Sequence, residues 1–270
     1  MLKNKQLEEL RLKYPKNTRI RLDYMHDDPR PVEPGTKGTV EVIDDMGTIH
    51  CRFDNGRRLG ISPEVDKFHK ILKISIDFDD VLYYTCKMIF ELGEKYLKNH
   101  NIDYKIDETQ FDIDKLFNIS PIIASDLWVN AFEMHNPIYL IDTASMILRT
   151  IKDRYDTESE ITTSRPDFND ERIKLKQLIT AMKPKFEFDN INIGINDKAA
   201  FLTENCFDIH IDDHPRHISA LQNTNVVPIL TDFESTRYNK AFAASYDGYI
   251  MKRWADLPRI IEAIISERKK

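Results

Sequence analysis

Apolar and polar residues alternate in short runs along the first part of the chain. A short helical pattern at 7–13 comes first, and the alternating runs TRIRLDY, TKGTVEVI, TIHCRF and RRLGI follow it. Between the runs stand Pro34-Gly35, Asp44 to Gly47 and Asn55-Gly56, residues that accept the backbone angles of tight turns. The pattern predicts four or five short strands that form a small all-β, SH3-like domain at residues 1–69.

The pattern changes at about residue 70. KILKISIDF is a continuous apolar run followed by acidic residues, which is typical of a strand buried in a parallel sheet. Helical periodicity extends over about 81–155, and the apolar runs SEITTS, NINIGI, FDIHIDD and NVVPILTD then follow, with helical patterns between them. Strands that alternate with helices predict an α/β domain with a doubly wound parallel sheet at 70–270. The helical block is too long for one crossover, so we expect a helical cap at about 84–150.

Composition narrows the classes of protein and partner. With 270 residues the chain is long enough for two domains, and its net charge of −6 offers no general basic surface for nucleic acid. No apolar run approaches the roughly 20 residues that cross a bilayer, so we expect no membrane partner. Cys51, Cys86 and Cys206 follow no metal-ligand spacing, which predicts reduced thiols in a cytoplasmic protein.

Acidic residues follow the first predicted strand of the second domain. Asp77 and Asp79 lie two residues apart, directly after the apolar run 71–76. Open α/β sheets bind ligands at the carboxyl ends of their strands, where one carboxylate can attack phosphorus and the other can carry the leaving-group proton. The same spacing occurs in metal-binding loops and as solvated charge, and the pair alone does not decide among these readings.

Polar residues follow a later strand and open a later helix. Thr163, Ser164 and Arg165 end the run EITTSRP, where hydroxyls and backbone N–H groups at a helix entry can hold a phosphate. An ordinary Ser/Thr helix entry has the same composition. Arg165 can clamp the phosphate or pair with Asp167, and the sequence favours neither. Lys198 opens a helix, where a cation opposes the helix dipole but would be useful beside a phosphoryl group.

Asp212 and Asp213 close the strand predicted in FDIHIDD. Paired carboxylates at the end of a buried strand are costly unless a cation or hydrogen-bond donors meet them. We therefore expect a metal ion at this pair, and the sequence does not tell which of the two acids contacts it. His214 and His217 follow closely, and we assign them no role beyond a surface loop.

The order of these motifs resembles that of the haloacid dehalogenase (HAD) superfamily of phosphatases, over about residues 71–265. IDFDDVL, ITTSRP, Lys198 and IDDHP resemble the four motifs of its 5′(3′)-deoxyribonucleotidase branch, and the ending VVPILTDFESTRYNK with Arg253-Trp254 is also similar. The resemblance implies a HAD-like Rossmannoid sheet with a helical cap inserted after the first strand. The stretch PGTKGTVEVIDDMGTIHCRFDNGRRLGI resembles uncharacterised domains of phage and bacterial proteins, for which no activity is implied.

The resemblance implies a Mg²⁺-dependent phosphomonoesterase that works through a phospho-aspartyl intermediate. Asp77 is then the nucleophile, and Asp79 protonates the leaving alcohol and later takes a proton from water. The implied substrate is a small phosphomonoester, in this branch a nucleoside monophosphate. The implied phosphate ligands are Thr163, Ser164, Arg165 and Lys198, and the implied metal ligands are Asp77, Asp79, Asp212 and Asp213.

Two positions depart from the branch. Asp80 stands where many relatives have glycine, and Thr85 stands where some carry an aromatic residue that contacts the base. Tyr84 or Trp128 would then line the substrate pocket. Trp128 and Phe132 share one face of a predicted helix, and packing within the cap is the simpler explanation of that face.

Other functions stay open. The same catalytic residues would serve a phosphatase of sugar phosphates, of other small phosphomonoesters or of nucleic-acid ends. A non-catalytic binding protein built on a HAD fold is a further alternative, although a complete set of motifs argues against it. The N-terminal domain mixes arginines with acids, so we expect it to bind a protein partner or nucleic acid, or to join two copies in a homodimer.

Overall fold

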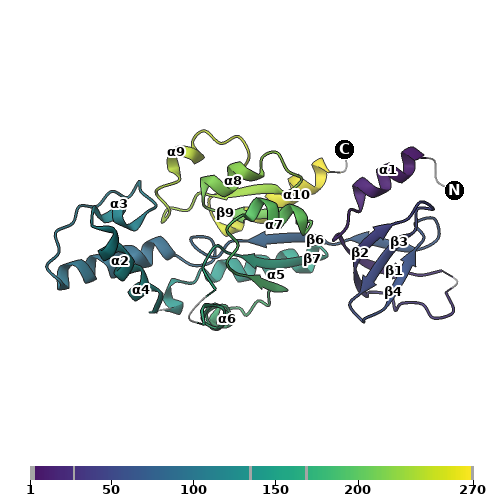
Figure 1. Cartoon of the computed structure of the whole chain (residues 1–270), viewed down its shortest axis with the longest axis horizontal. Helices are drawn as coiled ribbons and strands as arrows, with labels where there is room; N and C mark the ends of the chain where they lie inside the picture. Colours follow the sequence, from purple (N-terminus) through teal and green to yellow (C-terminus); the bar gives the residue numbers. More distant parts are fainter. Residues whose placement is uncertain (1–3, 27, 134–135, 168–169, 269–270) are drawn as a thin grey trace.

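The computed structural model describes residues 4–26, 28–133, 136–167 and 170–268. Three blocks follow one another along its longest axis: an N-terminal sheet, a central sheet flanked by helices, and a cluster of helices beyond it (Figure 1). The three blocks contain two main hydrophobic cores that are separate from each other. One belongs to the N-terminal sheet, and the other joins the central sheet to the helical cluster.

The N-terminal block is a five-stranded antiparallel sheet in the order β4-β3-β2-β1-β5. Alternate strand residues, among them Ile20, Val40 and Phe53, pack with Leu7 of helix α1 (Asn4–Lys13) into one core. An antiparallel sheet is thus confirmed, while its SH3-like assignment stays a prediction. The strands are β1 (Arg19–Tyr24), β2 (Lys37–Ile43), β3 (Ile49–Phe53), β4 (Arg58–Ile61) and β5 (Lys67–Lys70).

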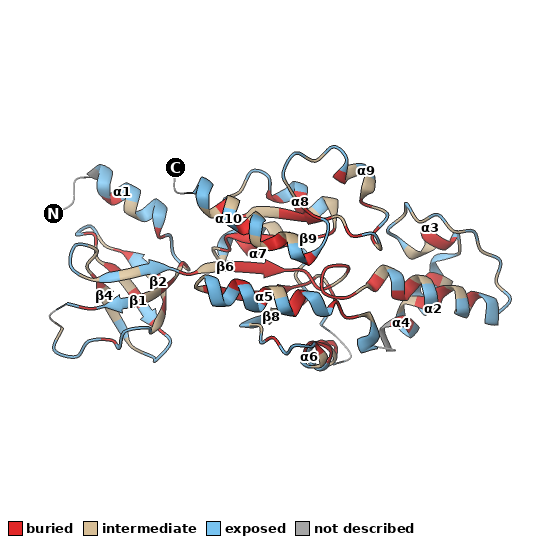
Figure 2. Ribbon diagram, turned by 180° about the vertical axis from the view of Figure 1, so that it is seen from behind, coloured by how far each residue is buried: buried red, intermediate tan, exposed pale blue. Residues whose placement is uncertain are grey.

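The central sheet is six-stranded and entirely parallel, in the order β11-β10-β9-β6-β7-β8. The parallel sheet expected from the sequence is therefore confirmed. Its strand β6 lies in the interior and is almost wholly buried (Figure 2). The last strand, β11, was not expected from the sequence. The strands are β6 (Leu72–Ile76), β7 (Thr157–Thr162), β8 (Asn190–Asn192), β9 (Ile209–Asp212), β10 (Val227–Thr231) and β11 (Tyr249–Met251).

Helices connect the parallel strands and cover the sheet (Figure 1). Among them, α5 packs against β7 and α10, and α8 packs against β10. None of the helices that the structure describes is long and apolar enough to cross a membrane. The connecting helices are α5 (Asp142–Arg154), α6 (Glu171–Ala181), α7 (Lys198–Glu204), α8 (Pro215–Leu221), α9 (Lys240–Ala243), η2 (Trp254–Asp256) and α10 (Leu257–Glu267).

The helical cluster is inserted between β6 and α5, and it lies at the end of the central sheet that is opposite the N-terminal sheet (Figure 1). Gly93 permits its close packing, because a Cβ there would lie 2.7 Å from the ring of Phe117. Within the expected cap range, α5 packs on the sheet instead. The side chain of Phe132 lies outside the described part. The cluster comprises α2 (Thr85–Asn99), α3 (Ile113–Phe117), α4 (Pro121–Glu133) and η1 (Pro137–Tyr139).

Ion pairs join the N-terminal sheet to the amino ends of the central strands. The guanidinium of Arg19 donates to the two carboxylate oxygens of Glu158 at 2.8 and 2.9 Å, and Lys37 Nζ donates to the same group at 3.0 Å. Glu158 is only 6% exposed. Since the two hydrophobic cores are separate, these polar contacts hold the junction. Further pairs across it are Arg21–Asp156, His69–Asp156 and Lys70–Asp208.

Glu158→Gln should lower the free energy of unfolding by up to about 3 kcal/mol, because it removes one charge of a buried ion-pair cluster. Unfolding in urea measures this change. Glu64→Gln alters an exposed glutamate of the same N-terminal part and should change stability by less than about 0.5 kcal/mol. Equal effects of the two substitutions would contradict a stabilising role of the junction.

Candidate active site

A tight turn after β6 carries the first group of acidic residues. The N–H of Asp77 donates to the carbonyl of Ile211 on β9 at 2.9 Å, so the chain is still part of the sheet there. Asp80 then adopts a left-handed backbone (φ 50°), and its N–H donates to the carbonyl of Tyr83 at 2.8 Å. The turn buries Asp77 and Asp80 and leaves Asp79 half-buried.

Lys198 connects this turn with the acids after β9. Its Nζ lies 2.8 Å from Asp77 Oδ1 and 2.6 Å from Asp212 Oδ2. Asp197 caps α7 by accepting the N–H of Ala200, which fixes where the helix and its lysine begin. Burial lowers the pKa of Lys198, but the carboxylates of Asp212 and Asp77 outweigh it, and the pKa lies above its ordinary value. The ammonium is therefore a fixed positive charge.

Three buried carboxylates surround this ammonium. Oxygens of Asp77, Asp212 and Asp213 all lie within 4.8 Å of one another. Burial, with the charges of Asp212 and Asp79, raises the pKa of Asp77 to about 7, although Lys198 opposes the shift. Burial and the neighbouring acids also raise the pKa of Asp213 well above its ordinary value. One ammonium does not balance three buried carboxylates, so this all-oxygen donor set fits a divalent cation.

The two adjacent acids differ in their hydrogen bonds. Asp212 Oδ2 accepts from Lys198 and from His210 Nε2 at 2.8 Å, and Asp212 Oδ1 accepts the N–H of His214 at 2.8 Å. The carboxylate of Asp213 is buried, and the described residues offer it no hydrogen-bond donor. Asp213 is thus the acid of the pair with oxygens available to a cation, while Asp212 holds the lysine.

Arg165 is paired with Asp79 and not with Asp167. Its Nε and Nη2 donate to the two oxygens of Asp79 at 2.8 and 2.6 Å, and its Nη1 donates to Glu171 at 2.7 Å. Asp167 pairs with Arg172 instead, so that alternative from the sequence is wrong. Burial alone would raise the pKa of Asp79, but Arg165 outweighs it, and the pKa is lowered. Asp79 is therefore ionised.

The two hydroxyls after β7 both take part in hydrogen bonds. Thr163 Oγ1 accepts the N–H of Arg165 at 3.2 Å, so its own proton remains available for a ligand. Ser164 Oγ donates its proton to the carbonyl of Ile195 at 2.9 Å. Of the two expected phosphate-binding hydroxyls, Thr163 is therefore the better donor in this conformation.

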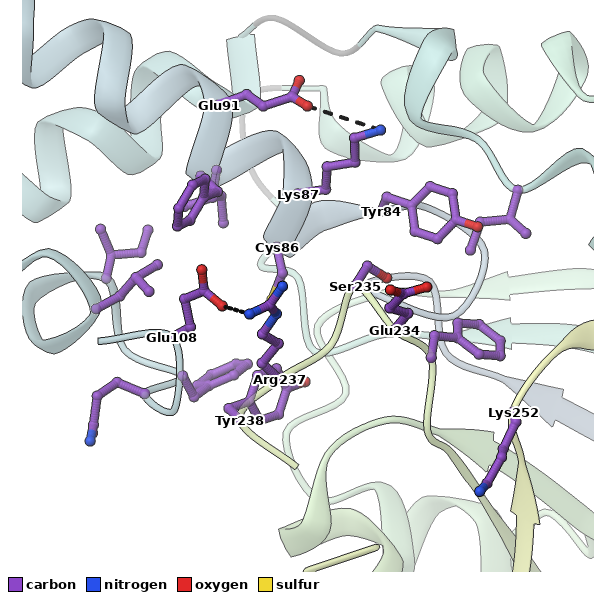
Figure 3. A pocket seen from close by; sticks show the side chains of 18 of the residues that line it. Tyr84, Cys86, Lys87, Glu91, Glu108, Glu234, Ser235, Arg237, Tyr238 and Lys252 are labelled. Atoms are coloured by element: carbon purple, nitrogen blue, oxygen red, sulfur yellow. Dashed lines mark ion pairs between the residues drawn. The ribbon is translucent and has the colours of Figure 1, made fainter. Parts of the chain in front are cut away.

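A pocket of about 660 Å³ opens beside these acids, between α2, the segment before α3 and the loop after β10 (Figure 3). The carboxylates themselves do not line it, but Cys86 does, and the N–H of Cys86 donates to Asp80. The ion pair between Glu108 and Arg237 spans the pocket from the helical cluster to the sheet (Figure 3). Its aromatic lining consists of Tyr84, Phe90, Phe111, Phe233, Tyr238 and Trp254.

The two aromatic residues singled out in the sequence lie apart. Tyr84 lines the pocket, whereas Trp128 packs on α4 against the core and is not among the lining residues. Phe111 contributes instead: its ring centroid lies 4.6 Å from that of His214 and 5.0 Å from that of Tyr238. His214, to which no role was assigned, therefore connects the acids after β9 to the wall of the pocket.

Comparisons with known proteins bear on both parts of the chain. A family model described as a domain of unknown function (DUF4314) matches residues 3–71, and none of the curated proteins matches the sequence. A solved haloacid dehalogenase-like family hydrolase from Streptococcus pneumoniae is similar, with a TM-score of 0.54 and 14% identity over 71% of this chain and 98% of its own.

Further solved structures agree. A protein described as a predicted phosphatase, from Clostridium acetobutylicum, has a TM-score of 0.51 and 17% identity over 71% of this chain and 99% of its own. One described as a predicted phosphoglycolate phosphatase, from Haemophilus somnus, has a TM-score of 0.53 and 14% identity over 71% and 98%. The larger part of the chain has the haloacid dehalogenase fold. At these identities the likeness establishes the HAD fold, which the four motifs predicted, and not a substrate.

Several residues of the site were not predicted from the sequence. Thr85 was noted only as a position where some relatives carry an aromatic residue. Its hydroxyl donates to the carboxylate of Asp79. Asn239 Nδ2 donates to the carbonyls of Asp213 and Thr231, at 2.9 and 2.8 Å; Asn239 lies in the similar ending VVPILTDFESTRYNK, but no role was expected for it. His210 did leave a signal, because it is a polar residue inside the apolar run FDIHIDD.

In the absence of a metal ion, the free energy of unfolding should fall as the pH rises, because buried acids of the site lose their protons. Burial raises the pKa of Asp80 to about 7, so the folded chain keeps a proton that the unfolded chain releases between about pH 4 and 7. Asp80→Asn keeps an acceptor for the N–H of Cys86 and removes the charge. In EDTA, the free energy of unfolding should fall between pH 5 and pH 8 by at least about 1 kcal/mol more in the wild type than in Asp80→Asn.

Urea unfolding at the two pH values measures this effect. Asp126→Asn, at an exposed position on α4, is the matched control and should leave the pH dependence unchanged. The same pH dependence in Asp80→Asn as in the wild type would show that Asp80 is not the buried acid responsible.

Proposed function

We propose that the protein is a divalent-cation-dependent phosphomonoesterase that acts on nucleoside monophosphates. The observation that supports this best is the position of Lys198 between Asp77 and Asp212, at the carboxyl ends of β6 and β9. Ligands of open parallel sheets bind at this edge, and a carboxylate beside a fixed ammonium suits attack on a phosphate ester. Solved hydrolases of the same fold support the reaction class.

Asp77 is the proposed nucleophile. Its carboxylate attacks phosphorus, the alcohol leaves, and water then hydrolyses the acyl phosphate on Asp77 to release inorganic phosphate. Lys198 would neutralise the phosphate oxygens as negative charge builds up on them, and the hydroxyl of Thr163 would donate to one of them. Both groups are already fixed by the fold, so little reorganisation opposes the reaction.

Asp79 is the proposed acid and base. The leaving alkoxide needs a proton, and the water that attacks the acyl phosphate must lose one. The contact with Arg165 keeps Asp79 ionised, which suits the second step. The first step requires the carboxylate to leave Arg165 and to take up a proton. Binding of phosphate by Arg165 would need the same rearrangement, since its Nε, Nη1 and Nη2 donate to Asp79 and Glu171.

Magnesium is the proposed cation. Asp77, Asp213 and the backbone carbonyl of Asp79 would hold it, with Asp212 beside them, because oxygen ligands of this charge suit Mg²⁺. When bound, it would balance the buried carboxylates and polarise the phosphate.

The aromatic pocket supports a nucleotide as substrate. Flat rings stack favourably on aromatic side chains, and a pocket with six of them beside the phosphate site suits a nucleobase. The walls also offer polar partners for the edge of a base, such as Gln110, Ser235 and Glu234. A sugar phosphate would use this lining less well.

Asp77→Asn should reduce phosphate release at least about a thousandfold, because it removes the nucleophile. Release is measured with Mg²⁺ and with EDTA, from nucleoside monophosphates, sugar phosphates and phosphorylated oligonucleotide ends. Asp126→Asn should retain wild-type activity. Wild-type release that needs no divalent cation, or that survives Asp77→Asn, would exclude this mechanism, and release from sugar phosphates alone would exclude the nucleotide.

Tyr84→Ala should raise KM for nucleoside monophosphates about tenfold or more, because it removes one aromatic wall of the pocket. The rate with glycerol phosphate, which has no ring, should change little. Steady-state kinetics on the two substrates measure the difference. Trp128→Phe, outside the pocket, should leave both KM values unchanged, and an equal loss on both substrates in Tyr84→Ala would argue against base recognition there.

A further inference from the structure

His210 is a buried polar residue in the middle of a parallel strand. It lies on β9 between Ile209 and Ile211, and it is 0% exposed. Interior strands of parallel sheets normally carry apolar side chains, because a buried polar group needs partners. His210 has a partner at each ring nitrogen: Nδ1 lies 2.9 Å from Ser75 Oγ, and Nε2 lies 2.8 Å from Asp212 Oδ2.

The partners decide where the protons of His210 lie. A carboxylate only accepts hydrogen bonds, so the imidazole must donate its Nε2 proton to Asp212. Nδ1 of the neutral ring is then an acceptor, and it takes the hydroxyl proton of Ser75. Ser75 lies on β6 directly opposite His210 in the strand register, and all three side chains are fully buried. The carboxylate of Asp212 thus selects the tautomer of the histidine, and the serine hydroxyl gives the other ring nitrogen its partner.

This arrangement determines the orientation of the Asp212 carboxylate. Oδ1 is bound by the N–H of His214, and Oδ2 is bound from two sides by His210 and Lys198. With the carboxylate fixed, Lys198 Nζ is held in a position that also reaches Asp77. Without His210, Oδ2 would keep Lys198 as its one side-chain donor among the described residues, and the carboxylate could turn with it.

We propose that His210 is a positioning residue: Ser75 holds its ring in place, and the Nε2 proton of the ring fixes Asp212 and, through Asp212, the ammonium of Lys198 beside Asp77. It touches neither the substrate nor the cation. Its effect on the reaction rests on the proposed phosphatase function, whereas the hydrogen-bonded chain from Ser75 to Lys198 can be tested without it.

Steady-state kinetics on the full chain with Mg²⁺ test the effect on the reaction. Partners behind the groups that act on the substrate typically contribute 10–100-fold, so His210→Leu should lower kcat by about that factor. KM should stay unchanged, because the fixed ammonium matters most in the transition state. His210→Gln, which can still donate to Asp212, should recover most of the loss. Full kcat in a folded His210→Leu, or no recovery in His210→Gln, would overturn the proposal.

Ser75→Ala provides a second variant in case His210→Leu does not fold. It should lower kcat by about tenfold, because Nδ1 of His210 loses its partner and the ring is no longer held against Asp212. Ser159→Ala is the matched control: Ser159 is a buried serine on β7, opposite Ile74 of β6, and the change should leave kcat as it is. Equal kcat in Ser75→Ala and Ser159→Ala would contradict the role of Ser75.

Long-range ¹H–¹⁵N spectra of the histidine rings test the hydrogen-bonded chain independently of activity. The wild type should show His210 protonated at Nε2, and Ser75→Ala should shift the Nδ1 resonance, because that nitrogen loses its hydrogen bond. A ring protonated only at Nδ1 in the wild type would overturn the proposal. If the wild type releases no phosphate from any substrate, the proposed function fails, and these spectra still decide whether Ser75 and His210 are arranged as inferred.

Discussion

Mutual repulsion of buried carboxylates at one edge of the central sheet is the constraint on which the rest of the structure depends. Asp77, Asp212 and Asp213 are brought within a few ångströms of one another where water cannot screen them. Such a cluster is tolerable only if positive charge meets it. Lys198 supplies one fixed charge, and the acids that remain unbalanced favour a divalent cation. The stability of the apo protein and its chemistry thus have the same electrostatic origin.

The opposite edge of the sheet shows the same principle with a different result. There, Glu158 and Asp208 are buried as well, but arginine and lysine side chains of the N-terminal sheet and Arg268, directly after α10, balance them. Because only Ile71 separates β5 from β6, the N-terminal sheet continues directly into the strand that ends at Asp77. The N-terminal sheet therefore holds the amino ends of the central strands, and none of its residues lines the pocket.

The sequence predicted which residues meet, but not how they share their protons and charges. Strand-end acids and Lys198 were recognisable because parallel strands bring their carboxyl ends to one edge. The division of labour between Asp212 and Asp213 was not, since it depends on contacts with His210 and with the N–H of His214. The partners of Arg165 were not predicted, for a similar reason. Its partners Asp79 and Glu171 lie 86 and 6 residues away, and neither distance leaves a local pattern.

The loop after β9 contacts both the helical cluster and the segment after β10. The N–H of His214 holds Asp212, and its ring contacts Phe111 from the helical cluster. Asn239, beyond β10, holds the backbone carbonyl of Asp213. A ligand that displaces Phe111 in the pocket would therefore act on the segment that positions Lys198 and the free carboxylate. The wall of the aromatic pocket and the carboxylates around Lys198 are thereby connected through three consecutive residues, Asp212, Asp213 and His214.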